Sequence, residues 1–135
     1  MIKIVLISCV KTKLQHKSKA EDLYISPLFK LSLKYAKSLS PDKIFILSAK
    51  YGLLGLNEEI EPYDLTLNKM LLKERKLWAE RVIEQLKKVS NLQEDKFIFL
   101  TGKRYREYLI PHIKNSDELN LSMGNRLKFL KEKTK

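Results

Sequence analysis

Hydroxyl, thiol and basic side chains gather near the start of the chain, in a stretch that reads SCVKTK. The candidate substrate-binding residues of this region are Ser8, Lys11, Lys13, Asp22 and Tyr24. Backbone amides at the start of a helix, with lysines nearby, form a binding site for an anion. The glycines of a Walker sequence are absent, so the stretch favours a single phosphate or a carboxylate over a nucleoside triphosphate.

The same stretch holds the single cysteine of the chain, Cys9. The neighbouring Lys11 and Lys13 favour its thiolate, which would make Cys9 a nucleophile or a redox centre. A cysteine at the end of a buried strand is more often a small core residue. Both interpretations stay open, and Cys9 ranks as a candidate catalytic residue behind Asp64 and Lys50.

Aromatic, basic and acidic residues occur together in a second region, which opens with SAKYGLL and closes with EPYDLTL. Its candidate residues are Lys50 and Asp64 for catalysis and Ser48, Tyr51, Gly52, Tyr63 and Thr66 for substrate binding. The tyrosine rings suit a flat heterocycle, on which they would stack, while Asp64 accepts hydrogen bonds or acts as general base. The alternative interpretation makes Asp64 or Thr66 a helix cap and the tyrosines anchors of the loop.

A third region, TGKRY, adds Gly102, Arg104 and Tyr105. Arg104 lies near a predicted helix start, where a guanidinium group can clamp a phosphate. It can equally be a solvated surface charge. The three regions have one thing in common, which is that each directly follows an apolar run.

Those apolar runs predict the elements that must position the candidate residues. Strands are expected at 2–8, 43–48 and 96–101, with a short last strand at 119–122, and helices at 27–39, 68–89, 104–110 and 125–133. Runs without alternation are typical of strands buried on both faces of a parallel sheet. The order βαβαβα(β)α predicts a single α/β domain over residues 1–135, with a mostly parallel sheet of three to four strands in three or two layers.

Two connections are long for such a fold, at 9–26 and 49–67. Each follows the carboxyl end of a strand, which is the edge of an open parallel sheet where ligands bind. We therefore expect the three regions to converge on one site at that edge.

The charge of the chain is +11 over 135 residues, and it is concentrated at the two ends. Residues 1–20 hold five lysines and no acid, and residues 124–135 hold five basic residues and Glu132. Such asymmetry fits attraction to a polyanion such as tRNA, DNA or a nucleotide. A lysine-rich surface without any nucleic-acid partner is the competing interpretation.

Other classes of protein and site find no support in the sequence. The lone cysteine, the absence of a secretory signal and the absence of a long apolar run favour a cytoplasmic protein without a membrane partner. No metal motif, hydrolase elbow or dinucleotide fingerprint occurs, so neither a metal nor a cofactor is expected. The oligomeric state is left open.

Four motifs resemble the signature of a family of small bacterial, archaeal and phage proteins of unknown function. They read SCVKTK, AEDLYISPLFK, ILSAKYGLL and IEPYDLTL, the last followed by RKLWAERV, and they span Ile7 to Val82. The first motif is also distantly similar to the opening of the archaeosine synthase core, an enzyme of tRNA base modification. The proline that follows the lysine there is missing here, so this similarity implies only a class of substrate.

Two hypotheses account for these features. In the first, the protein is an enzyme acting on a nucleotide, a nucleoside or a nucleic-acid base. Lys11, Lys50 and Arg104 would then hold phosphate, while Tyr51 and Tyr63 stack on the base and Asp64 orients the sugar or moves a proton. In the second, the protein is a non-catalytic module whose basic first loop and C-terminal helix grip RNA or DNA.

Overall fold

A five-stranded, mostly parallel sheet forms the centre of the computed structural model, which describes residues 1–8, 13–118 and 123–134. The strands are β1 (Lys3–Ser8), β3 (Lys43–Ser48), β4 (Gly52–Gly55), β6 (Lys96–Leu100) and β7 (Asn115–Glu118). Their order is β4-β3-β1-β6-β7, and only the β3–β4 pair is antiparallel. The mixed α/β class and the mostly parallel sheet expected from the sequence are confirmed.

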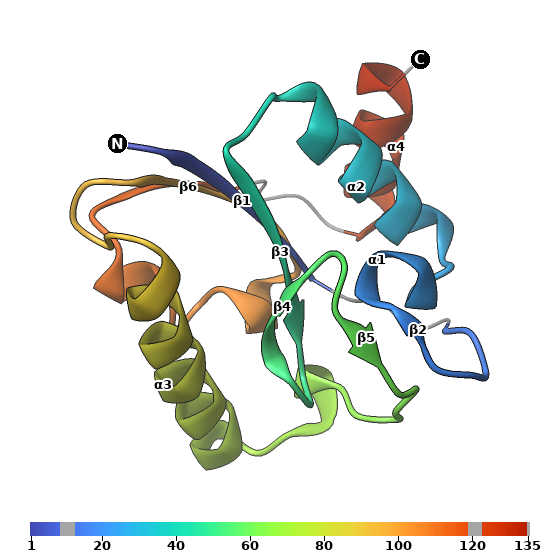
Figure 1. Ribbon diagram of the computed structural model, residues 1–135, viewed down its shortest axis with the longest axis horizontal. Helices are drawn as coiled ribbons and strands as arrows, with labels where there is room; N and C mark the ends of the chain where they lie inside the picture. Colours follow the sequence, from blue (N-terminus) through green and yellow to red (C-terminus); the bar gives the residue numbers. More distant parts are fainter. Residues whose placement is uncertain (9–12, 119–122, 135) are drawn as a thin grey trace.

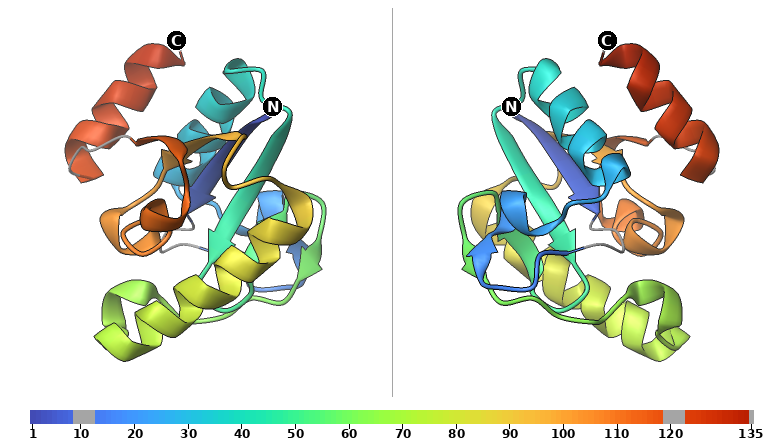
Figure 2. Two further views of the ribbon diagram at one scale, coloured as in Figure 1. Left: turned by 90° about the vertical axis from the view of Figure 1, so that its left-hand side faces the viewer. Right: turned by 90° about the vertical axis from the view of Figure 1, so that its right-hand side faces the viewer.

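Three helices flank this sheet: α2 (Pro27–Ser38), α3 (Leu72–Val89) and α4 (Met123–Lys133). Helices α2 and α4 lie together on one side of the sheet, and α3 lies on the other (Figures 1 and 2). The side chain of Ser26 accepts a hydrogen bond from the Phe29 amide and caps α2, whose first residue is a proline. The cap and the helix start that the sequence predicts at these residues are confirmed.

Short elements occupy the two long connections. They are β2 (Ser18–Lys19) and α1 (Ala20–Leu23) in the first, and β4, β5 (Glu59–Ile60) and the 3₁₀ turn η1 (Leu67–Lys69) in the second. Strands β2 and β5 pair with each other as a separate antiparallel ribbon. The described parts of the two connections therefore contain short regular elements that pair with each other.

The sheet has more strands than the three to four expected. The sequence predicts a loop at the position of β4, but this segment folds back on β3 through a tight turn and pairs with it as a strand. The last strand lies at Asn115–Glu118, and the expected one at 119–122 lies outside the described residues. Hydrophobic periodicity misses both strands, because they are short and rich in glycine or polar residues.

The prediction of a helix at 104–110 is wrong. Two 3₁₀ turns, η2 (Lys103–Tyr105) and η3 (Ile110–His112), take its place. Pro111 supplies no amide for an α-helical hydrogen bond, and it lies in the first turn of η3, where that amide is not needed. The described helices include none that is both long enough and apolar enough to span a bilayer.

Candidate functional site

Three buried hydroxyl residues mark the carboxyl ends of the central strands. Ser8 ends β1, Ser48 ends β3, and Thr101 directly follows β6. The strands run in parallel, with Ser8 paired to Leu47 and Ile7 to Leu100, so these ends share one edge of the sheet. From β1 the chain crosses to β3 and then back past β1 to β6. Such a reversal of direction is where open α/β sheets bind ligands.

Backbone pairing brings the first and second long connections together beyond this edge. Strands β2 and β5 pair there, with Ser18 opposite Ile60. The amide of Ala20 donates to the carbonyl of Glu58 at 2.7 Å, and the amide of Glu21 donates to that of Leu56 at 3.0 Å. The two connections therefore form one unit.

Three tyrosines from these connections form a cluster, hereafter the tyrosine cluster: Tyr24, Tyr51 and Tyr63. The hydroxyl oxygens of Tyr24 and Tyr63 are 2.6 Å apart and share a hydrogen bond. The Tyr63 ring meets Tyr51 edge-to-face at 5.6 Å and Tyr24 at 6.4 Å between centroids. Aromatic rings prefer this geometry. Tyr24 is fully buried, so its ring serves the packing of the cluster and is not open to a ligand.

Ser48 fastens the tyrosine cluster to the sheet. Its hydroxyl donates to the Tyr63 hydroxyl at 2.8 Å. The same oxygen accepts from the amides of Lys50, at 3.3 Å, and Tyr51, at 3.1 Å, which shapes the turn between β3 and β4. Its carbonyl accepts from the indole of Trp78 on α3 at 2.9 Å. Ser48 therefore links β3 to the tyrosine cluster and to α3 through hydrogen bonds.

Two lysines lie over the rings of the cluster. The Lys13 ammonium is 4.7 Å from the centroid of Tyr63 and 5.9 Å from that of Tyr24. The Lys50 ammonium is 5.3 Å from the centroid of Tyr51. Cation–π attraction holds both lysines beside the aromatic residues, which places two ammonium groups at this edge of the protein.

A hollow of about 410 Å³ opens beside the cluster, with a predominantly polar lining. The residues that line it are Lys13, Leu14, Gln15, Pro62, Tyr63 and Asp64. Three of the sequence-predicted site residues, Lys13, Tyr63 and Asp64, thus meet at one place, although they come from two different connections. Asp64 is exposed, and no described residue bonds to its carboxylate.

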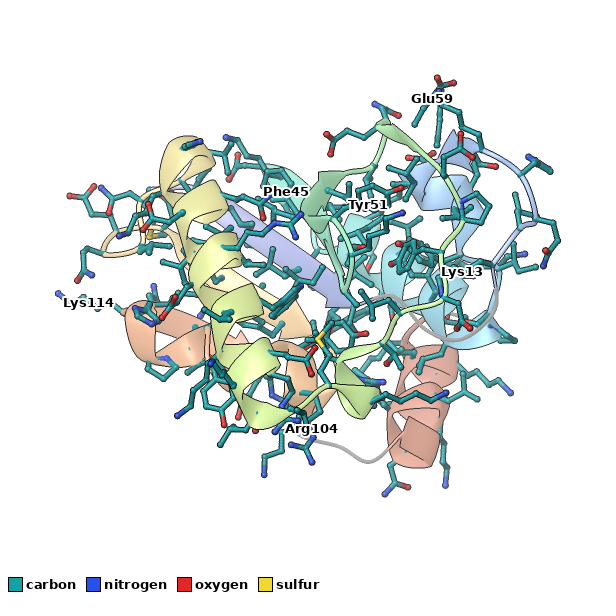
Figure 3. The ribbon with its side chains drawn as sticks, turned by 90° about the horizontal axis from the view of Figure 1, so that it is seen from below. Lys13, Phe45, Tyr51, Glu59, Arg104 and Lys114 are labelled. Atoms are coloured by element: carbon teal, nitrogen blue, oxygen red, sulfur yellow. The ribbon has the colours of Figure 1, made fainter. Side chains whose placement is uncertain are left out.

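The third region does not join this group. Tyr105 is buried, with its ring edge-to-face on Trp78 at 5.8 Å and its hydroxyl 3.4 Å from the Leu67 amide. Arg104 is half-exposed and lies 3.7 Å from Glu107. Figure 3 places Arg104 near the start of α3, apart from Lys13 and Tyr51. Two of the three regions thus supply residues to the hollow, whereas the third, in the described part of the chain, contacts the first only through residues outside the hollow, by the hydrogen bond from the Gly102 amide to Ser8.

Two other predicted site residues have structural explanations. Gly52 has a φ of +75°, and a Cβ atom there would meet Gln85 Oε1. Only glycine tolerates both conditions. Thr66 accepts a hydrogen bond from the Asn68 amide and caps η1, as the alternative interpretation expects.

The remaining candidates either do not line the hollow or are not among the residues that the structure describes. Ser8 accepts from the Gly102 amide at 3.2 Å and joins β1 to the end of β6. Asp22 is exposed on α1. Cys9 and Lys11 lie outside the described residues.

The structure buries two arginines that are not among the candidate site residues, Arg106 and Arg126, each with 5% of its surface exposed. Arg126 precedes the buried Leu130 by four residues and so shares the inward face of α4. The sequence signal that could have identified Arg126 is an arginine on the apolar stripe of a predicted helix.

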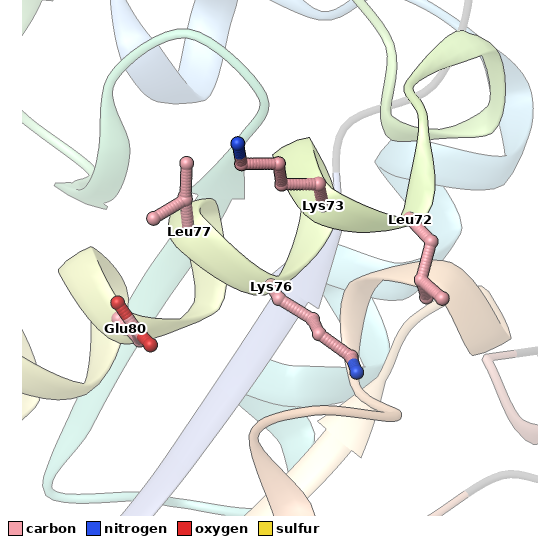
Figure 4. Close-up of a pocket in the computed structure, with 5 residues that line it drawn as sticks. All are labelled: Leu72, Lys73, Lys76, Leu77 and Glu80. Atoms are coloured by element: carbon pink, nitrogen blue, oxygen red, sulfur yellow. The ribbon is translucent and has the colours of Figure 1, made fainter.

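A second hollow, of about 390 Å³, lies on the outer face of α3 (Figure 4). It is lined by Leu72, Lys73, Lys76, Leu77 and Glu80. All five residues come from one helix, and none offers an aromatic ring or a hydroxyl group. The hollow beside the tyrosine cluster is therefore the better candidate for chemistry.

Within the described ranges, no three His, Cys, Asp or Glu side chains gather as a metal ion would require. A comparison with curated proteins gives no match. A comparison with family models gives a match over residues 4–132, which is nearly the whole chain. The chain therefore belongs to the family of unknown function DUF6884.

Proposed function

We propose that this protein is an enzyme that acts on a nucleotide, a nucleoside or a nucleic-acid base bound in the hollow beside the tyrosine cluster. One observation carries the proposal: Lys13, Tyr63 and Asp64 line the same hollow, beyond the carboxyl ends of β1 and β3. A cation, an aromatic ring and a carboxylate are the groups that bind the phosphate, base and sugar of a nucleotide.

Each of the three residues has a distinct role in this proposal. Lys13 holds the phosphate, because it is the lysine that lines the hollow. The exposed part of Tyr63 contacts the base, while its hydroxyl is held by Tyr24 and Ser48. Asp64 accepts a hydrogen bond from a sugar hydroxyl or removes a proton as general base, since its carboxylate is exposed and without a described partner.

A thermal-shift screen tests this assignment. The ligands are the four ribonucleoside 5′-monophosphates, their nucleosides, the free bases, and short single-stranded RNA and DNA. A ligand at about one hundred times its Kd stabilises the folded state by about 2.7 kcal/mol. We expect one class of small ligand to raise Tm, and Asp64→Asn to weaken its affinity about ten- to a hundredfold, as the loss of one charged hydrogen bond does.

Matched variants separate the hollow from general charge effects. Glu94→Gln removes one exposed carboxylate elsewhere, and Lys17→Gln removes one exposed lysine of the first connection. Both should bind like the wild type, whereas Lys13→Gln should not. If Asp64→Asn and Lys13→Gln bind and react like the wild type, the site has been assigned wrongly. Any small-molecule hit is then incubated with the protein and analysed for product by mass spectrometry.

A second candidate function, a non-catalytic RNA- or DNA-binding module, has an observation of its own. Helices α2 and α4 pack together, with Tyr35 and Phe129 edge-to-face at 5.7 Å. Their exposed lysines, hereafter the basic helix layer, are Lys30, Lys34, Lys37, Lys128, Lys131 and Lys133. Glu132 is the one acid in these two helices. Such a surface suits contacts to phosphates along a nucleic-acid backbone.

The two functions predict different responses to salt and mutation. Binding through the basic helix layer falls steeply with salt, by roughly 0.7 to 0.9 in the log–log slope for each phosphate contact. Lys131→Gln with Lys133→Gln would weaken it, and Asp64→Asn would leave it unchanged. Stabilisation by oligonucleotides alone, with that pattern of variants, would favour the module over the enzyme.

A further inference from the structure

A buried arginine on α4 has a charge that no described residue neutralises. Arg126 is 5% exposed and lies on the inward face of the helix, four residues before the fully buried Leu130. Its Nε is sealed from solvent and has no hydrogen-bond partner. A guanidinium group keeps its charge in proteins, so it does not escape this situation by losing a proton.

No carboxylate side chain of the protein pairs with Arg126. The chain has sixteen Asp and Glu residues, and every one of them lies in the described part of the sequence. None forms a salt bridge or hydrogen bond with Arg126. A buried charge without a partner costs free energy, so proteins rarely keep one unless it has a use.

A second buried guanidinium group adds to the positive charge. Arg106 is also 5% exposed, and it donates to Glu118 at 3.0 Å and to the carbonyl of Thr101 at 2.6 Å. Burial, and then the charge of Arg106, lower the pKa of Arg126, so the two groups lie within electrostatic reach of each other. Glu118 pairs with Arg106, and no carboxylate side chain pairs with Arg126, so the charge of Arg126 is not balanced by a described acid.

A further buried polar atom lies at the same end of the sheet. Thr101 is fully buried, and its hydroxyl oxygen has no hydrogen-bond partner. It directly follows β6, and its carbonyl holds Arg106. Buried hydroxyl groups are normally bonded, so an unbonded one beside excess positive charge points to a missing acceptor.

We propose that Arg126, supported by Arg106 and Thr101, binds a phosphoryl group beyond the carboxyl end of β6. The paired planar forks of arginine match the oxygens of a phosphate, which brings the negative charge that this region lacks. The shared chemistry is a phosphoryl group, either free inorganic phosphate or the phosphate of a nucleotide. The site has no residue in common with the hollow beside the tyrosine cluster, so it stands or falls independently of the proposed function.

Isothermal titration with sodium phosphate, at an ionic strength held constant with sodium chloride, tests the site. The wild type should bind phosphate, and Arg126→Met should bind it about ten- to a hundredfold more weakly. Lys114→Met, at an exposed position directly before β7, should bind like the wild type. In phosphate-free buffer Arg126→Met should unfold at the same temperature as the wild type or higher, because it removes an unpaired buried charge.

A measurement on the wild type keeps the test decisive even if the variant fails to fold. The side-chain Nε–H signal of Arg126 should shift in the NMR spectrum when phosphate is added. An unshifted signal, or equal phosphate affinity in Arg126→Met, would overturn the proposal.

Titrations with AMP and adenosine identify the source of the phosphoryl group. AMP binding that is tighter than phosphate binding and is weakened by Arg126→Met indicates a nucleotide at this site, because binding in the hollow does not depend on Arg126. Equal affinity indicates the free anion. Asp64→Asn should leave inorganic phosphate binding unchanged in either case, which separates this site from the hollow.

Discussion

Removing the hydroxyl group of Ser48 should loosen the tyrosine cluster and destabilise the protein. Ser48 is fully buried, and its oxygen joins Tyr63 to the amides of Lys50 and Tyr51 at distances of 2.8 to 3.3 Å. A neutral hydrogen bond contributes about 1 kcal/mol net. The bonds to Tyr63 and Tyr51 are the shorter ones, while Lys50 is exposed and its amide can turn to water. We therefore expect Ser48→Ala to cost about 2 kcal/mol.

The assay is urea unfolding, followed by a double-mutant cycle with Tyr63→Phe. Because the Ser48–Tyr63 bond is absent in either single variant, the costs should not add, and the coupling should be about 1 kcal/mol. Ser38→Ala is the control, since this exposed serine bonds only to the carbonyl of Tyr35 within its own helix. It should change stability by less than about 0.5 kcal/mol.

Two results would refute this reasoning. A Ser48→Ala variant within about 0.5 kcal/mol of the wild type would show that its three hydrogen bonds are replaced by water at no cost. A coupling near zero would show that Ser48 and Tyr63 do not depend on each other. In either case the cluster would not be anchored to β3, and the shape of the hollow would need another explanation.

Gly52→Ala should cost about 2 kcal/mol in urea unfolding, because it adds a Cβ at a positive φ and against Gln85. Asp95 accepts hydrogen bonds from the amides of Asn91, at 2.7 Å, and Ile2, at 2.9 Å, and these bonds lower the pKa of its carboxyl group. Its stabilisation is therefore complete above the ordinary value of about 3.8 and is lost as the pH falls toward the lowered pKa. Asp95→Asn should accordingly destabilise the protein at pH 7 and flatten its loss of stability in acid, measured as urea midpoints between pH 7 and pH 2.

Apolar runs and local caps in the sequence predict most of the fold. The three central strands follow from uninterrupted apolar runs, and α2 follows from Ser26, Pro27 and its apolar stripe. Strands β4 and β7 could not be found in this way, because pairing with a neighbour rather than their own composition makes them strands.

Part of the candidate site could be predicted from the topology of the strands. Topology places the ends of β1 and β3 at one edge, so Lys13, Tyr63 and Asp64 could be expected to meet. Topology does not predict the direction in which a side chain points. Tyr105 points into the core against Trp78, and Arg104 pairs with Glu107.

We propose that the hollow beside the tyrosine cluster binds a nucleotide-like ligand. The most direct measurement is a ¹H–¹⁵N NMR titration of the wild type with each of the four ribonucleoside 5′-monophosphates. We predict that one of them shifts the backbone amides of residues 13–15 and 63–64, and that Asp64→Asn abolishes these shifts at the same concentration. Shifts confined to α2 and α4, or none in residues 13–15 and 63–64 with any nucleotide, would contradict the claim.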